Sequence, residues 1–416
     1  AGEYVLVTST TTALTASDIN ATWDSEAPAG MEYVVDVVGG NIVFRASFLS
    51  NWVWEGTEDG EGMVWSDSAD GWQAEGGSPA GQDLYFTSVG AGEVAVSGVV
   101  TPANVDISGG EYTFVADAAG GSIELGEGGV LNIGASADVT LALDNEKLGG
   151  TTQLGGTLVL QSAGALGDTE LAFNGGTLVY DSVDNGDGTF THVSVDLGDQ
   201  AGVAADYEGA LKVQVTHADN DVVWGENAAT SDDNSGVLAA LNNGIEKTGE
   251  GQLNLQWQNS ANTTYAGAMT VKEGRLDIYS TVGTKGWTFS GGMAVDGYLN
   301  LRFGSAADAN DVVLSGAMSG TGTIEVGSAT LPGGNGGRVA FAGNNSGFAG
   351  TLILSGPADK ATTSIGNVAR VDSANSLGGA ASTLVHNGRQ VWFNITNDVT
   401  VFGMQNIVVN KDTVNY

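Results

Sequence analysis

The sequence predicts an all-β protein, and more specifically a right-handed parallel β-helix with loop insertions. Three observations predict it: short alternating runs of four to six residues along the chain, 65 glycines against 5 prolines, and almost no helical periodicity. Glycine this abundant without a collagen period indicates many tight turns between short strands. Apolar residues reach 42%, too many for a disordered glycine-rich linker.

The alternating runs begin after a glycine and are separated by Gly, Asn or Asp. In residues 156–160, Leu158 and Leu160 face one way and Val159 faces the other, so stacked strands would align the leucines into a column. With roughly 20–25 residues per coil, each repeat buries its apolar face against its neighbours, which lets a chain of 416 residues fold as one array. An antiparallel sandwich or a propeller is the alternative. Helical turns are expected only at residues 236–241 and 306–308.

The charge is strongly negative, with 49 acidic and 13 basic residues and a net charge of −36. Such a surface repels nucleic acids and anionic membranes, so neither is an expected partner. The absence of cysteine excludes thiol catalysis, cysteine-ligated metals and disulfides. No apolar run approaches the ~18 residues of a membrane helix, and we expect the chain to be a secreted piece of a longer protein.

One segment carries a recognisable motif. Residues 245–255 contain Lys-Thr-Gly-x-Gly-x-Leu, residues 262–267 contain an Asn and an aromatic residue before Gly267, and residues 270–276 form a valine strand that ends in Gly-Arg-Leu. This segment resembles the passenger-associated strand repeat of bacterial autotransporters. A second, more divergent copy runs from 314 to 352, where Phe348 takes the place of Tyr265 and the lysine is missing.

The resemblance implies a domain organisation and a location. Residues 1–48 are expected to be the end of a preceding β-helical module or an N-terminal cap, residues 49–90 a tryptophan-rich cap and the start of the rod, and residues 91–416 the rod, with an acidic loop insertion near 181–235. It also implies a secreted or bacterial cell-surface protein that reaches the membrane only through a C-terminal translocator outside this chain. The oligomeric state is left open.

The tryptophans are the first candidate for ligand binding. Trp52, Trp54, Trp65 and Trp72 fall close together and are followed by two further aromatic residues, Tyr85 and Phe86. Indole faces can stack on sugar rings while neighbouring Asp and Asn bind hydroxyls. The alternative, which we favour, is that they cover the open end of the repeat array.

Acidic residues supply the candidates for catalysis and for calcium. Asp184 and Asp187, beside Asp181, lie in a glycine-containing turn, but their spacing differs from that of the usual calcium loop, so an Asx-rich turn is the favoured interpretation. No other cofactor is expected. A carboxylate-dependent hydrolase would use two acids at a controlled separation. Its candidates in the acidic insertion are Asp181, Asp184, Asp187, Asp219, Asp221, Asp232 and Asp233.

The histidines give one further hypothesis. His192 and His217 are about one coil apart, so they would stack on neighbouring strands, whereas His386 lies far away in sequence. A zinc site with Asp219 or Asp221 is conceivable, but a surface pair is the favoured interpretation.

The expected function is therefore non-enzymatic. We expect a surface-presented passenger module that is adhesive toward extracellular glycans or host glycoproteins, or that serves as a structural stalk. The alternative is a secreted hydrolase, acting as a glycoprotein or mucin protease or as a polysaccharide-degrading enzyme, with its site in a groove along the side of the rod.

Overall fold

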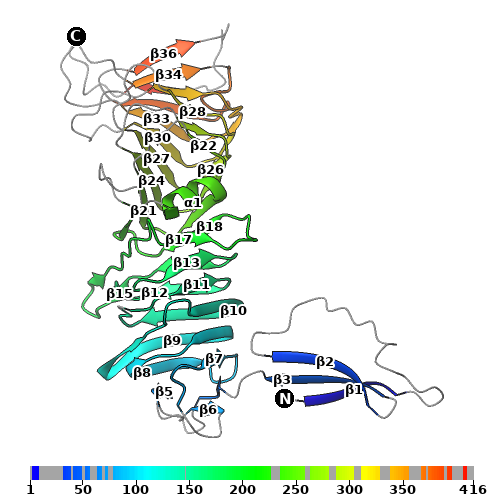
Figure 1. Ribbon diagram of the computed structural model, residues 1–416. Coiled ribbons are helices and arrows are strands. Elements are labelled where there is room, and N and C mark those ends of the chain that lie inside the picture. Colours follow the sequence, from blue (N-terminus) through cyan, green and yellow to red (C-terminus); the bar gives the residue numbers. More distant parts are fainter. Residues whose placement is uncertain are drawn as a thin grey trace. The chain divides into compact units, whose positions relative to one another are not determined.

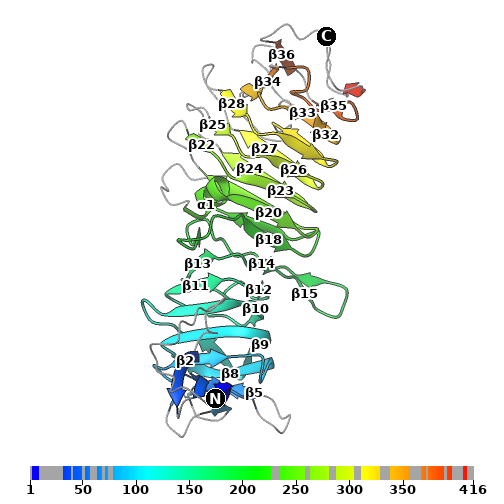
Figure 2. The same ribbon diagram turned by 90° about the vertical axis from the view of Figure 1, so that its right-hand side faces the viewer.

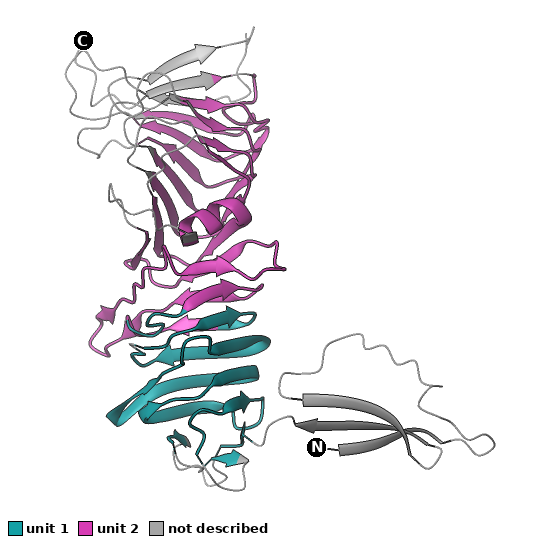
Figure 3. Ribbon diagram, viewed as in Figure 1, with its two compact units in different colours: residues 1–157, 164–169 teal, residues 158–163, 170–416 magenta. Residues whose placement is uncertain are grey.

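The computed structural model is nearly all β, with long parallel sheets. The chain divides into two compact units, residues 1–157 with 164–169 and residues 158–163 with 170–416 (Figure 3). The structure describes residues 2–8, 31–38, 41–48, 52–56, 63–67, 71–73, 78–145, 147–225, 235–257, 263–280, 287–303, 311–327, 338–355, 367–371, 373–387, 391–395 and 406–409.

The N-terminal segment forms a separate three-stranded antiparallel sheet. Strand β3 (Asn41–Phe48) lies in the middle, between β1 (Gly2–Thr8) and β2 (Met31–Val38). The expectation that residues 1–48 end a preceding module or form a cap stays a prediction.

The rest of the first unit is built mainly from parallel pairs. Leu84 pairs with Val105 and Val105 with Leu131, so one buried aliphatic position repeats on three successive strands. The short pair β4–β6 is antiparallel. The strands are β4 (Val53–Trp54), β5 (Met63–Trp65), β6 (Trp72–Gln73), β7 (Asp83–Phe86), β8 (Gly92–Val100), β9 (Asn104–Ile123), β10 (Val130–Ala142) and β11 (Thr151–Leu154).

The second unit begins with strands that lead into three longer parallel sheets. Figure 2 shows the hairpin β15–β16 standing out from its neighbours. The helix α1 (Ser235–Asn243) confirms the helical turns expected at 236–241, whereas residues 306–308 lie outside the described part of the chain. These first strands are β12 (Thr157–Leu160), β13 (Glu170–Phe173), β14 (Thr177–Tyr180), β15 (Val183–Asp184), β16 (Phe190–Thr191) and β17 (Ala201–Val203).

The three sheets of the second unit are each a stack of parallel strands (Figure 1). The first continues through β18 (Leu211–Val215), β20 (Gly244–Thr248), β23 (Ala268–Val271), β26 (Met293–Val295), β29 (Met318–Gly320) and β32 (Gly347–Phe348). The second contains β19 (Asp221–Trp224), β21 (Gln252–Trp257), β24 (Arg275–Ser280), β27 (Tyr298–Phe303), β30 (Thr323–Val326), β33 (Thr351–Ser355), β35 (Thr383–Asn387) and β37 (Asn406–Val409). The third contains β22 (Thr263–Tyr265), β25 (Trp287–Phe289), β28 (Asp311–Leu314), β31 (Arg338–Phe341), β34 (Asn367–Val371) and β36 (Val391–Ile395).

Register partners in the second sheet of this unit are separated by 23 to 32 residues of chain. Leu253 pairs with Leu276, and Leu276 pairs with Leu299, each 23 residues further on. The separation rises to 28 residues between Ile324 and Leu352. The extra residues fall in the connections between sheets, so the alternation within each strand is preserved.

Buried aliphatic columns form the core of this unit. The alternation predicted from the sequence puts every second residue of a strand on the same side, and those residues are almost fully buried. One column contains Leu253, Leu276, Leu299, Ile324 and Leu352, and the next contains Leu255, Ile278, Leu301, Val326 and Leu354.

Glycines at the turns also form a column, because backbone from the preceding strand occupies the place of a side chain. A Cβ atom on Gly316 would lie 1.8 Å from the carbonyl oxygen of Gly291, and one on Gly291 would lie 2.0 Å from that of Gly267. Gly343 repeats the arrangement, with 2.3 Å to the oxygen of Gly316. The abundance of glycine is thus explained in part by close backbone packing.

Replacing Gly316 with alanine is therefore expected to lower the free energy of unfolding by at least about 2 kcal/mol, because two neighbouring backbone segments must separate. The control is Gly202→Ala, since a Cβ atom there has no neighbour within 4 Å. Chemical denaturation followed by tryptophan fluorescence measures both variants. Equal midpoints for the two would show that the turns relax freely.

Candidate functional site

The candidate site is the side of the second sheet that lies opposite the aliphatic columns. On this side, the in-register strands place polar residues next to one another. The outer face of an antiparallel sheet, by contrast, commonly carries polar side chains that are solvated. Three of the polar residues on this side are almost fully buried, with exposed fractions of 7% for Asn254, 0% for Asp277 and 2% for Asn300. We call this surface the polar face, made of Asp221, Gln252, Asn254, Gln256, Arg275, Asp277, Tyr279, Tyr298, Asn300, Arg302 and Glu325.

Asp277 is the centre of the polar face. The Nε of Arg275 lies 2.6 Å from its Oδ1, and Arg302 donates from the neighbouring strand to its Oδ2. Because a buried carboxylate without partners is strongly unfavourable, the two guanidinium groups are what allow Asp277 to stay buried. The guanidinium of Arg275 also lies 4.7 Å from the ring centre of Tyr298, a cation–π contact that fixes both side chains.

On one side of Asp277 the network continues through amides to Asp221. Gln252 donates to Asn254 Oδ1 over 3.0 Å and to Asp277 Oδ2 over 3.3 Å, and Asn254 donates in turn to Asp221. Burial, and then the negative charge of Asp277, raise the pKa of Asp221, and the two arginines act against that rise. Among the described residues, Asp221 is thus the one acid predicted from the sequence that belongs to this network.

On the other side the network reaches Glu325. The hydroxyl of Tyr298 donates to one oxygen of Glu325, and Ser355 donates to the other over 2.5 Å. Burial and the adjacent Glu325 raise the pKa of Tyr298, so it keeps its proton and acts as a donor. Every carboxylate of the polar face thus accepts hydrogen bonds from neighbouring side chains. The arrangement provides a rigid array of donors and acceptors.

Of the remaining acids predicted from the sequence, those within the described residues do not join this network. Asp181 accepts hydrogen bonds of 2.9 Å each from Gln161 and Thr216. The backbone N–H of Asp219 donates to His217 Nδ1 over 3.2 Å. Asp232 and Asp233 lie outside the described residues.

Asp184 and Asp187 stabilise the turn of the β15–β16 hairpin. The carboxylate of Asp184 accepts the N–H of Gly186 at 2.8 Å. That of Asp187 accepts the N–H of Thr189 at 2.9 Å and its hydroxyl at 2.6 Å, and these bonds lower the pKa of Asp187. Both contacts are Asx-turn bonds, which is the local role favoured from the sequence. A calcium-binding or catalytic role for this pair stays a prediction.

Three of the four candidate tryptophans are buried in the first unit. Trp54 and Trp65 have no exposed surface and Trp72 is 6% exposed, and all three pack edge-on or tilted around Phe86 at 5.3 to 5.7 Å. Their ring faces are covered by this aromatic cluster. Only Trp52, which is half-buried, presents surface that a sugar ring is able to contact.

His192 and His217 lie close together in space, as their spacing of about one coil predicts. The rings of His192 and His217 are 5.0 Å apart, and Phe190 packs 4.3 Å from His217. Ser182 makes a 2.9 Å hydrogen bond with His192 Nδ1. Within the described ranges no three His, Asp or Glu side chains are grouped so that they would hold a metal ion.

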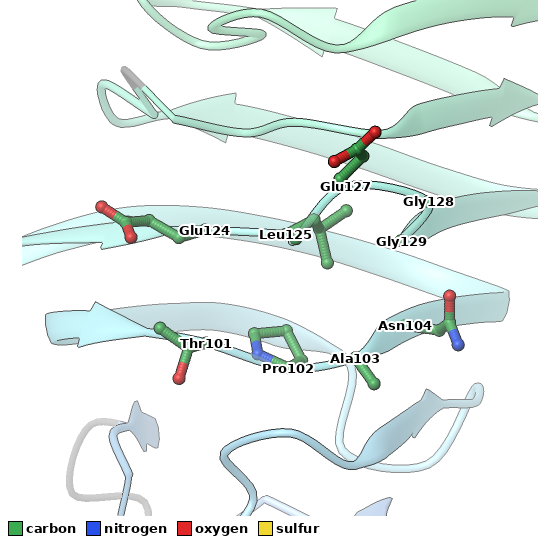
Figure 4. Close-up of a pocket in the computed structure, with 10 residues that line it drawn as sticks. Thr101, Pro102, Ala103, Asn104, Glu124, Leu125, Glu127, Gly128 and Gly129 are labelled. Carbon is green, nitrogen blue, oxygen red and sulfur yellow. The ribbon is translucent and has the colours of Figure 1, made fainter.

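A hollow of about 510 Å³ lies in the first unit (Figure 4). It is lined by the connection between β8 and β9 and by that between β9 and β10. The side chain of Asn104 is already hydrogen-bonded within the protein: it donates to Asp83 at 2.7 Å and accepts the N–H of Val130 at 2.8 Å. Glu124 lies 3.4 Å from Lys147. Asn104 and Glu124 are thus already engaged by other residues of the protein.

No protein-family model, curated protein or solved structure matches the chain. In the parts of the chain that are described, no helix has the length and apolar character needed to cross a membrane. The polar face is therefore interpreted from its own geometry.

The polar face is visible in the sequence only when three successive strands are aligned with one another. The strands Gln-Leu-Asn-Leu-Gln-Trp, Arg-Leu-Asp-Ile-Tyr-Ser and Tyr-Leu-Asn-Leu-Arg-Phe begin at residues 252, 275 and 298. Aligned at their constant spacing, they place Arg275 and Arg302 on either side of Asp277. Neither these arginines nor Asp277 is among the residues predicted from local acidic density.

Lys247, the lysine of the Lys-Thr-Gly motif, lies in the core and not on the polar face. Lys247 pairs with Val213 and Val271 on neighbouring strands, is fully buried, and its Nζ donates to the carbonyls of Thr248 at 2.7 Å and Gly249 at 2.8 Å. Burial lowers the pKa of Lys247 to about 8, although nearby Glu273 acts in the opposite direction. The lysine thus binds the carbonyls of the Lys-Thr-Gly turn from inside the core.

A pH-dependent stability follows for Lys247. Between its folded pKa of about 8 and its ordinary value of 10.5, the unfolded chain binds more protons than the folded one, so stability rises with pH in that window. Relative to Lys247→Met, the wild type is expected to gain about 2 kcal/mol from pH 8 to pH 10. Denaturant titrations of both proteins at several pH values measure this difference. A constant difference would contradict a lowered pKa.

Proposed function

We propose that this chain is a right-handed parallel β-helix of the autotransporter-passenger type, presented outside a bacterial cell, whose role is to bind through its outer surface. Supporting the architecture are parallel partners that repeat in register over many strands at separations close to the predicted coil length. The Lys-Thr-Gly turn supports it as well, because Lys247 ties that turn to the core.

Binding is favoured over catalysis by one observation, the complete pairing of the carboxylates in the polar face. A hydrolase of the two-acid kind needs one acid that is free to donate a proton and one free to attack or to activate water. Asp277 instead has no exposed surface and is held by two arginines, and Glu325 accepts two hydroxyl groups. Such a rigid surface is better suited to recognition.

The test is a direct measurement of binding. Purified chain is applied to an array of glycans and, in parallel, to immobilised extracellular glycoproteins with and without their glycans removed. Saturable binding to a defined set is expected. Signals at background on both surfaces, with release of fragments from a polysaccharide or a glycoprotein, would overturn the proposal in favour of the hydrolase.

A further inference from the structure

We propose that the polar face across β21, β24 and β27 is the binding site, and that it takes a neutral oligosaccharide. This rests on the proposed function, in that the chain acts by binding, and it adds the residues and the chemical class of the ligand.

The polar face is regular across β21, β24 and β27. The six residues of β21 pair one-to-one with those of β24, and those of β24 with β27, without a register shift. On this side of the sheet, every second residue of each strand lies next to its register partner on the neighbouring strand. These side chains form a regular grid whose strands are about 4.7–4.9 Å apart. That spacing is close to the length of one sugar residue in an extended chain.

Partly exposed planar groups on this grid suit sugar hydroxyls. The amides of Gln252 and Gln256 and the guanidinium groups of Arg275 and Arg302 each present two polar atoms side by side, which suits a pair of neighbouring hydroxyls. Tyr279 is half-buried, and within the described residues it makes no side-chain hydrogen bond or ring contact, so its ring is available to the C–H face of a sugar. Gln256 and Arg302 flank it in register on the neighbouring strands.

Two polar atoms of the polar face leave hydrogen-bonding capacity unused. Among the described residues, Asn300 Oδ1 and Arg302 Nε are buried without a hydrogen-bond partner, and the whole Asn300 residue is only 2% exposed. Buried polar atoms without partners are uncommon and costly. They lie two residues apart on the same side of β27, and one is an acceptor and the other a donor. A hydroxyl group is able to donate to the acceptor or to accept from the donor.

The charge of the surface selects the class of glycan. Asp221, Asp277 and Glu325 outweigh Arg275 and Arg302 by one negative charge, and the whole chain carries −36. A uronate or sialylated glycan would be repelled by this field, and both arginines are already paired with Asp277. A neutral chain with many hydroxyls avoids that cost.

Tyr279→Ala tests the assignment, because it removes the available ring without touching the Asp277 ion pairs. The variant, the wild type and the control Thr288→Ala, a half-buried residue on β25 in a different sheet, are compared on neutral oligosaccharides and on sialylated and uronate-containing ones. We expect wild type and control to bind neutral oligosaccharides equally, and Tyr279→Ala to bind them about tenfold more weakly. Thermal melts of all three proteins exclude loss of folding.

Three results would overturn the assignment while leaving the proposed function intact. The first is glycan binding that Tyr279→Ala does not weaken, and the second is binding confined to acidic glycans. The third is an absence of glycan binding with retained binding to deglycosylated protein. Background signal on every surface overturns both the assignment and the proposed function.

Discussion

Asp277→Ala is expected to lower the free energy of unfolding by about 2–4 kcal/mol, because it leaves Arg275 and Arg302 beside a buried gap with no counter-charge. The partial exposure of the arginines, 33% and 23%, allows some rehydration and keeps the cost below that of a fully buried pair. The denaturation midpoint, read from tryptophan fluorescence, is the measurement.

Two companion variants identify the cause. Asp296→Ala removes an exposed carboxylate that, within the described part of the chain, accepts hydrogen bonds only from Thr321, so its expected effect is below about 1 kcal/mol. Asp277→Asn keeps the shape and removes the charge, and should fall between the other two. If Asp277→Ala were as stable as Asp296→Ala, the buried ion pairs would contribute nothing measurable.

Asn345→Ala is expected to cost about 2–5 kcal/mol, since it leaves two buried backbone groups without partners. Asn345 has no exposed surface, and its Oδ1 accepts the N–H of Met318 at 2.7 Å while its Nδ2 donates to the carbonyl of Ser376 at 2.5 Å. One side chain thereby connects segments 27 residues before it and 31 after it. Denaturant titration measures the loss.

The neighbouring residue provides a matched control. Asn344 is exposed, and the one side-chain bond it makes within the described residues is local, accepting the N–H of Ser346 at 3.3 Å. Asn344→Ala should therefore change the free energy of unfolding by less than about 0.5 kcal/mol. Similar losses in the two variants would mean that the buried bridge is replaced by water. In the first unit, Asn145 bridges Ile123 and Ala165 in the same way, which indicates that the device is used more than once.

The sequence was most informative about what happens within a single strand. Alternation correctly placed Leu158 and Leu160 among the buried residues, and a short helix was expected where α1 lies. These features depend on neighbours two to four residues away, so they can be read along the chain. The predicted ring proximity of His192 and His217 is confirmed at 5.0 Å because it needed only an approximate coil length.

The polar face was missed because its members are close only after the strands are brought into register. Asp277 and Arg302 are 25 residues apart, and neither lies in the acidic insertion near residues 181–235. Local acidic density pointed instead to Asp184 and Asp187, whose carboxylates bind the backbone of their own turn. Aligning successive strands at 23-residue steps, rather than searching for clusters along the chain, would have found it.

The glycine column determines where the chain tolerates foreign residues. At Gly291, Gly316 and Gly343 there is no room for even one extra carbon atom, so a peptide tag or an epitope placed at these turns would force the strands apart. The connections between sheets differ in length from one repeat to the next, as between β30 and β31 compared with β24 and β25. Those connections, not the turns, are the permissive positions for displaying a cargo on this scaffold.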